Sequence, residues 1–144
     1  MAASTFLDTN IFIYQLDGAD PRKQVIANGL VRDALRTQEA CISYQVAQEC
    51  LNVITTKARV ALNSSQAQAY LDAVLAPLVQ VGSSTELFRR ALDLRERWRF
   101  SFYDSLIVAA ALTAGCSRLL SEDLQHGQKM EQLTIVNPFL EAGH

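Results

Sequence analysis

The sequence predicts a three-layer α/β/α domain with a central parallel sheet of about five short strands. Short apolar runs alternate along the chain with segments whose apolar residues recur at helical spacing. Clusters of Gly, Pro, Asp and Ser separate these segments. Strands that alternate with helices favour a parallel sheet covered by helices on both faces. Because 144 residues is the length of one ordinary domain, we expect a single domain over residues 1–144.

The first half of the chain is expected to supply two strands and four helices. Asp20 precedes Pro21, and this pair places a capping carboxylate before a proline at the first helical position. Ser43 is expected to cap the helix that follows it, and Pro77 to end the last helix of this half. The expected strands are 5–7 and 40–42, and the expected helices are 10–15, 21–37, 44 to about 59, and 65–75.

The second half is expected to supply three strands and two long helices. Gly82-Ser83-Ser84 turns the chain into the first of these helices, and Ser101 precedes the second. Gly115 suits the residue that follows a helix end, because glycine adopts the left-handed conformation found there. The expected strands are 78–81, 118–120 and 134–136, and the expected helices are 85–98 and 102 to about 114.

Composition excludes several classes of protein. The net charge of −2 argues against a polybasic coat that binds nucleic acid by bulk counterion release. Apolar runs such as residues 106–112 fall short of the ~18 residues of a membrane span, so we expect no membrane association. The amino terminus lacks a basic region followed by an apolar segment. Cys41, Cys50 and Cys116 show no C-x-x-C spacing, so we expect buried thiols in a cytoplasmic protein.

Four carboxylates occur where an α/β fold would bring them together, namely Asp8, Glu49, Asp104 and Asp123. Three of them lie where a short strand ends or a helix begins, which is where open parallel sheets bind their ligands. Clustered carboxylates raise each other's pKa, and desolvation adds to the cost of ionising them, so a cation is needed to neutralise them. Oxygen ligands suit hard ions, and the pattern therefore predicts a Mg²⁺ or Mn²⁺ site.

Each acid also has a purely structural interpretation. Asp8 suits the N-cap of a short helix, and Asp104 follows Ser101 at the spacing of a capping box. Asp123 suits a solvated loop. Glu49 is harder to explain in this way, because it lies on the apolar stripe of its helix, where a lone carboxylate is rarely tolerated. The joint occurrence of all four favours the metal site.

Local sequences extend this pattern to a known family. The blocks FLDTNIFIY (6–14), SYQVAQE (43–49), FYDSLIVAAA (102–111), LSEDLQHG (120–127) and VNPF (136–139) closely resemble the PIN-domain ribonucleases. Within that family the chain is most similar to the VapC-type toxins of bacterial toxin–antitoxin pairs, and the resemblance covers essentially the whole chain. It implies that the four acids form the metal and catalytic site, and that Thr9, Asn10 and Ser121 support them. Glu122 adds a competing acid, although the spacing favours Asp123.

The resemblance implies a Mg²⁺- or Mn²⁺-dependent endoribonuclease that is neutralised by an antitoxin and forms a homodimer. RNA is then the substrate, and no covalent nucleophile is required. Two alternatives stay open. The first is a catalytically silent PIN module that binds RNA or protein. The second is a metal-dependent phosphatase with Asp8 as nucleophile, which is weakened because Asn10 stands where such sites usually present a second acid.

A basic segment in the second half is a candidate for RNA contact. Its members are Arg89, Arg90, Arg95, Arg97 and Arg99. The alternative is a solvated helix face on which acids at positions 86 and 93 pair with arginines four residues later. Four aromatic residues between positions 98 and 103 are expected to be core or dimer contacts and not base-stacking platforms.

Overall fold

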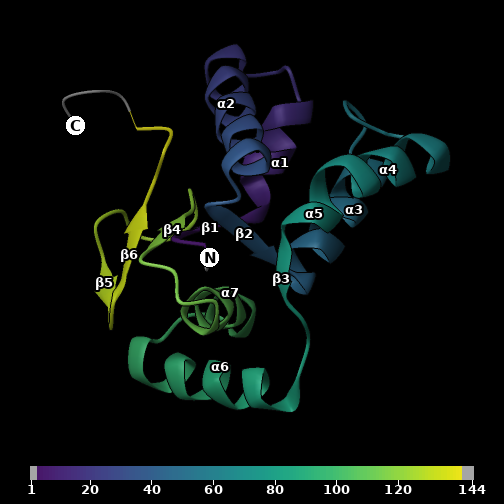
Figure 1. Ribbon diagram of the computed structural model, residues 1–144. Helices are drawn as coiled ribbons and strands as arrows, with labels where there is room; N and C mark the ends of the chain where they lie inside the picture. The colour runs from purple at the N-terminus through teal and green to yellow at the C-terminus, as the bar shows by residue number, and fades with distance from the viewer. Residues whose placement is uncertain (1–2, 141–144) are drawn as a thin grey trace.

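A computed structural model describes residues 3–140 and shows a six-stranded sheet at its centre (Figure 1). The strand order is β3-β2-β1-β4-β6-β5. All neighbouring pairs are parallel except β5 with β6. The strands are β1 (Thr5–Leu7), β2 (Ala40–Ser43), β3 (Val79–Val81), β4 (Arg118–Leu120), β5 (Lys129–Met130) and β6 (Leu133–Val136). The five expected strands are confirmed, and the short antiparallel β5 is an addition that the sequence did not reveal.

Helices cover both faces of this sheet, which confirms the three-layer α/β prediction. In Figure 1, α1 and α2 lie on one side of the sheet, and α7 lies on the other side with α6 outside it. Both α3 and α5 pack against β2. The helices are α1 (Thr9–Leu16), α2 (Pro21–Thr37), α3 (Tyr44–Thr56), α4 (Ser64–Tyr70), the π-helical turn η1 (Leu71–Leu75), α5 (Ala76–Leu78), α6 (Thr85–Trp98) and α7 (Phe102–Thr113).

The predicted helix ends are largely confirmed. The side chains of Asp20, Ser43 and Ser101 each accept a hydrogen bond from the backbone N–H three residues later. Such bonds satisfy amides that have no partner inside the helix. Gly115 follows the end of α7 with a φ of +78°, the left-handed conformation that glycine adopts without strain.

The prediction that Pro77 ends a helix is wrong. Helical backbone continues from α4 through η1 and into α5, which contains Pro77. The N–H of Ala76 donates to the carbonyl of Leu71, five residues back, instead of four. Proline has no N–H, and its ring crowds the carbonyl one turn earlier, so the wider π turn before it accommodates the ring. Leu78 consequently belongs to α5, and β3 begins at Val79.

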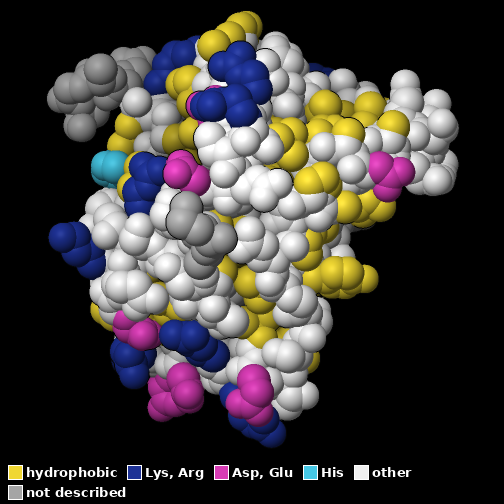
Figure 2. Space-filling view, in the orientation of Figure 1, with side chains coloured by type: hydrophobic (Ala, Val, Ile, Leu, Met, Phe, Trp, Pro, Cys, Tyr) yellow, Lys and Arg dark blue, Asp and Glu magenta, His cyan; other side chains and the backbone are white. Residues whose placement is uncertain are grey.

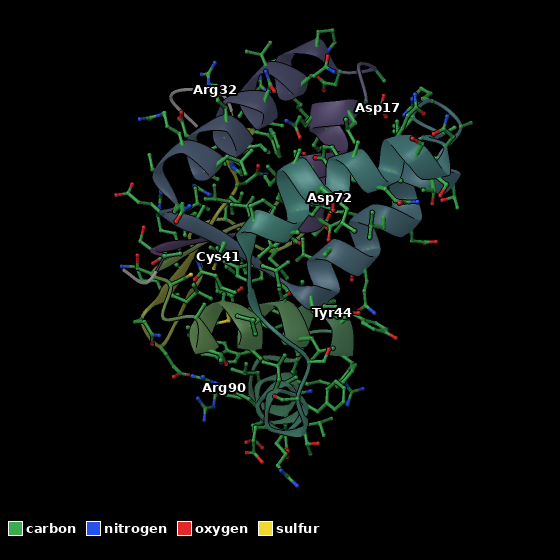
Figure 3. The ribbon with its side chains drawn as sticks, turned by 45° about the vertical axis from the view of Figure 1, so that its right-hand side comes forward. Asp17, Arg32, Cys41, Tyr44, Asp72 and Arg90 are labelled. Carbon is green, nitrogen blue, oxygen red and sulfur yellow. The ribbon has the colours of Figure 1, made fainter. Side chains whose placement is uncertain are left out.

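The helix α3 ends at Thr56, short of the expected end near Arg59, because the segment after it binds Asp17. Lys57 Nζ lies 2.9 Å and an Arg59 guanidinium nitrogen 3.0 Å from Asp17 Oδ2. These hydrogen bonds, that of Arg59 first, hold the pKa of Asp17 well below its usual range. Asp17 follows α1, as Figure 3 shows, so the ion pairs tie α1 to the chain that leaves α3.

The core is built from the strands and the inner faces of the helices. Phe6 of β1 and Ile42 of β2 are fully buried. All three cysteines are buried free thiols, as expected, and the sulfurs of Cys41 and Cys116 lie 3.7 Å apart. Among residues 3–140, no helix has both the length and the apolar character needed to cross a lipid bilayer.

Candidate functional site

Two adjacent strands bring the first site residues together at the carboxyl edge of the sheet. From β1 the chain steps to β2 and β3 in one direction, whereas β4 lies on the other side of β1. Such a reversal of strand order opens a crevice beyond the strand ends, where α/β proteins bind ligands. Asp8 directly follows β1, and Ser121 directly follows β4. Both side chains therefore lie at the crevice.

Asp8 acts as a helix cap and faces the crevice at the same time. Its Oδ1 accepts a hydrogen bond of 2.7 Å from the N–H of Thr9, which begins α1. Its Oδ2 accepts one of 2.8 Å from the Ser121 hydroxyl. The side chain is buried, and this burial, reinforced by the charges of Asp123 and Glu49, raises the pKa of Asp8 to about 6. Asp8 can therefore cap α1 and face the crevice at the same time, so the two interpretations of this residue are compatible.

Glu49 lies at the edge of the apolar stripe of α3, half-buried, and not within the core. The Thr9 hydroxyl donates to Glu49 Oε2 over 2.7 Å, and Gln45 Nε2 donates to Oε1 over 3.0 Å. Among residues 3–140 no Lys or Arg forms an ion pair with it. Only neutral donors bind this carboxylate, so its negative charge is not compensated.

Asp123 and Asp104 complete the acidic group from the second half of the chain. Asn10 Nδ2 lies 3.1 Å from Asp123 Oδ2, and the N–H of Asp123 donates to Ser121 Oγ over 3.2 Å. Burial raises the pKa of Asp123, and the charges of nearby acids, Asp104 first among them, raise it further. Asp104 lies in the first turn of α7, and its backbone N–H is capped by Ser101.

All four acids line one cleft of about 290 Å³. The other lining residues are Thr9, Asn10, Asn52, Val53, Tyr103 and Ile107. No Lys or Arg side chain lines the cleft within the part of the chain that the structure describes. Oxygen donors with this excess of negative charge fit Mg²⁺ or Mn²⁺ and not zinc. Over residues 3–140, no three Asp, Glu, His or Cys side chains lie together as a ready metal-ligand group.

Glu122 does not compete with Asp123 for the cleft. It pairs with Lys23 of α2, and Tyr14 donates to Glu122 Oε1 over 2.5 Å. The Lys23 ammonium also lies 4.7 Å from the centre of the Tyr14 ring. These contacts occupy Glu122 outside the cleft and leave Asp123 inside it, as the spacing in the sequence suggested.

Gln45 is a site residue that sequence reasoning missed. Besides its bond to Glu49, its Nε2 lies 3.3 Å from the carbonyl oxygen of Tyr103 at the start of α7. It thereby joins α3 to α7 beside the acids. Its position four residues before Glu49 on the same helix face is the only feature of the sequence that indicates this role.

The arginines of α6 divide into two groups. Arg89 pairs with Glu86, and Arg90 lies near Thr113 and Glu131, so these contacts replace the expected Glu86–Arg90 pair. The expected Asp93–Arg97 pair is not among the ion pairs of residues 3–140. Thr113 ends α7, whereas Asp104 lies in its first turn, so Arg90 is remote from Asp104. Arg95, Arg97 and Arg99 are exposed near the other end of α6. In Figure 2 the surface over α6 carries basic and acidic side chains intermixed.

The fold and the cleft define a class of protein, an α/β domain with a carboxylate-lined site at the carboxyl edge of its sheet. The family model of the PIN domain matches residues 5–129, and the chain belongs to the PIN domain family. This confirms the family resemblance found in the sequence. A search of curated protein sequences gave no match.

Three solved structures of similar fold cover most of the chain. A toxin-antitoxin complex from Klebsiella pneumoniae has a TM-score of 0.65 at 20% identity, over 94% of this chain and 98% of that one. VapC20 of Mycobacterium tuberculosis, a sarcin-ricin loop cleaving toxin, has a TM-score of 0.60 at 20% identity, over 81% of this chain and 87% of that one. VapBC2 of Rickettsia felis, bound to a DNA fragment from its promoter, has a TM-score of 0.63 at 17% identity, over 91% of this chain and 96% of that one. At these identities the likeness establishes the fold.

Proposed function

We propose that this protein is a Mg²⁺- or Mn²⁺-dependent endoribonuclease and the toxin of a toxin–antitoxin pair. The observation that carries the proposal is the convergence of four carboxylates, from four separate segments, on one cleft. Membership of the PIN domain family supports nuclease chemistry. The similar structures support the toxin role, because one is a toxin-antitoxin complex and another is a toxin that cleaves the sarcin-ricin loop.

Asp8, Glu49, Asp104 and Asp123 are proposed to hold the metal. Burial, reinforced by the charges of the neighbouring acids, raises the pKa of Asp8 and of Asp123, and a cation relieves both the desolvation and the repulsion. A bound Mg²⁺ or Mn²⁺ ion supplies Lewis-acid chemistry, lowering the pKa of an attacking water and neutralising charge on the leaving oxygen. The carboxylates orient that chemistry at the edge of the sheet.

Thr9, Asn10 and Ser121 are proposed to position the acids. Each donates a hydrogen bond to a different carboxylate, to Glu49, Asp123 and Asp8 respectively. Because the three donors are neutral, they fix the oxygens without cancelling the charge that attracts a cation. Both oxygens of Asp8 accept hydrogen bonds, which favours a fixed ligand over the free nucleophile that the phosphatase alternative needs.

Two protein partners belong to the proposal. One is a second copy of the chain, because exposed apolar side chains such as Val25 of α2 suit a two-fold interface. The other is an antitoxin whose tail covers the cleft and places an Arg or Lys among the acids instead of the metal. Light scattering at micromolar concentration tests the first, with a stable monomer as the contrary result.

Cleavage of RNA by the purified, partner-free protein tests the enzyme. We expect cleavage of structured RNA with Mg²⁺ or Mn²⁺, none in EDTA, and strong loss with Asp104→Asn, which keeps the size and the backbone cap of that residue. Asp93→Asn, on the exposed face of α6, is the matched control and should cleave normally. Undiminished cleavage in EDTA contradicts a metal mechanism.

A further inference from the structure

A second groove adjoins the acidic cleft and has a different chemical character. It measures about 340 Å³ and lies between the start of α3, the loop after β3, and the facing ends of α6 and α7. None of its lining residues carries a formal charge. Its walls include the aromatic side chains of Tyr44, Phe88, Phe102 and Tyr103. Its volume lies within the range of about 300 to 1,000 Å³ that is typical of small-molecule sites.

Several of these aromatic rings are available to a ligand. Tyr103 is 66% exposed, Tyr44 52% and Phe88 46%, although large aromatic side chains are usually more deeply buried. Phe102 packs edge-on against Tyr103, with ring centres 5.7 Å apart, and lies 6.3 Å from Phe88. Figure 3 shows Tyr44 at the start of α3, beside α7. The rings are thus mutually supported, yet each of the first three keeps an open face or edge.

The groove shares a wall with the acidic cleft. Tyr103 lines both cavities, and Gln45, which lines the groove, donates to Glu49 and to the carbonyl of Tyr103. A molecule in the groove therefore lies against the residues that hold Glu49. The cleft is anionic and suits a metal with a phosphate, whereas the groove is uncharged and suits an apolar, flat group that is attached to that phosphate.

We propose that this groove is a nucleobase subsite, which binds the base of a nucleotide next to the scissile phosphate of single-stranded RNA. Unpaired bases stack on aromatic side chains and form hydrogen bonds through their edges. The groove supplies both kinds of group, the rings and the amides of Gln45 and Gln48. The proposal departs from the expectation that Phe102 and Tyr103 are core or dimer contacts, and the 66% exposure of Tyr103 excludes a core position for that ring. The inference rests on the proposed ribonuclease function, and it makes substrate selection a property of α3, α6 and α7 beside the acids.

Fluorescence of 2-aminopurine tests the subsite without requiring cleavage. Short single-stranded oligoribonucleotides carry the probe at successive positions, and binding is measured with Ca²⁺ in place of Mg²⁺. We expect stacking to quench the probe at one position. Phe88→Ala and Tyr44→Ala should each weaken binding of that oligonucleotide by about fivefold to a hundredfold, the range found for base–aromatic stacking. Phe88→Tyr and Tyr44→Phe, which keep a ring, should restore binding.

Leu92→Ala is the matched control. Leu92 lies one turn after Phe88 on α6 and is 53% exposed, but it does not line the groove. It should leave quenching and binding unchanged. With Mg²⁺, Phe88→Ala should raise the KM for RNA cleavage and change kcat little. An oligonucleotide that lacks the base at the quenched position should bind wild type and Phe88→Ala equally well.

The outcomes separate the subsite from the enzyme. If the wild-type protein quenches the probe but cleaves no RNA with Mg²⁺, and Phe88→Ala abolishes the quenching, the nuclease function is refuted and the base subsite is retained. If wild type cleaves RNA and the three variants Phe88→Ala, Tyr44→Ala and Leu92→Ala all show the same KM as wild type, the subsite is refuted and the nuclease function is retained. Loss of the dimer in Phe88→Ala by light scattering, with quenching unchanged, assigns the groove to a second copy of the chain and overturns the proposal.

Discussion

The Thr9 hydroxyl donates a hydrogen bond of 2.7 Å to Glu49 Oε2, across 40 residues of sequence. The same arrangement recurs at two of the other acids, because Ser121 donates to Asp8 and Asn10 to Asp123. Each donor is a neutral hydroxyl or amide. Neutral donors fix a carboxylate in place but leave its charge, whereas an Arg or Lys would cancel it. The network therefore positions negative charge while preserving the need for a cation.

Asp8→Asn should stabilise the metal-free protein at neutral and higher pH. Burial raises the pKa of Asp8 from 3.8 to about 6, so the folded protein binds this proton more tightly than the unfolded chain does. Ionising Asp8 therefore costs stability as pH rises from 3.8 to about 6, and the full cost persists above that. Asparagine removes the charge and still caps α1. In EDTA at about pH 8 the gain should approach about 3 kcal/mol in urea unfolding.

The same measurement at about pH 3.5 should show the gain largely gone, because Asp8 is then mostly protonated in both states. Asp17→Asn gives the opposite sign and serves as the control. Lys57 and Arg59 hold the pKa of Asp17 below its usual range, so this carboxylate contributes stability at neutral pH that is lost as pH falls through its folded pKa. A gain from Asp8→Asn that is independent of pH contradicts the charge mechanism.

Glu49→Gln distinguishes a site residue from a core residue. Because no Lys or Arg within residues 3–140 pairs with Glu49, the substitution leaves no uncompensated cation, and the metal-free protein should be as stable as wild type or more so. Mg²⁺ at a hundredfold excess over Kd stabilises a folded protein that binds it by about 2.7 kcal/mol. That increase should shrink in Glu49→Gln.

Thermal melts of both proteins with EDTA and with Mg²⁺ measure these two effects together. Glu39→Gln is a suitable control, because Glu39 is an exposed acid outside the cleft lining. A large loss of stability in EDTA, together with an unchanged Mg²⁺ shift, removes Glu49 from the metal site.

Much of the fold and of the acidic cleft could be predicted from the sequence, because the helix starts and strand ends that form them depend on neighbouring residues. Asp20 and Pro21 start a helix through their own chemistry, and Asp8 and Ser121 follow apolar strands whose shared edge is set by parallel pairing. The features that could not be predicted depend on contacts between distant segments or on surrounding structure. Lys23, 99 residues from Glu122, draws that acid out of the cleft. The two-residue β5 is too short for any periodicity, and the π turn before Pro77 depends on surrounding structure.

Asp123→Asn and Glu122→Gln should affect different properties. Asp123 lines the cleft, so its substitution should reduce the Mg²⁺-induced rise in Tm and the cleavage rate. Glu122 is bound by Lys23 and Tyr14, so its substitution should lower the free energy of unfolding by about 1 to 3 kcal/mol, the value of a hydrogen bond to a charged group. Its Mg²⁺ shift should match that of wild type. The reverse pattern in calorimetry with and without Mg²⁺ makes Glu122 the ligand.

Arginine substitutions along α6 test which part of the basic segment contacts RNA. Asp104 lies in the first turn of α7 and Thr113 ends that helix, so their separation of nine residues spans about 14 Å. Arg90 lies beside Thr113, whereas Arg97 and Arg99 adjoin the turn that leads to Asp104. If one of these two contacts a phosphate, its replacement by Ala should weaken RNA binding and reduce the slope of log affinity against log salt by about 0.7 to 0.9. Arg36→Ala, near the end of α2 that leads into β2 at the amino edge of the sheet, should leave the slope unchanged. Equal slopes for all three variants, measured by fluorescence anisotropy between low and moderate salt, make α6 a solvated face without a role in RNA binding.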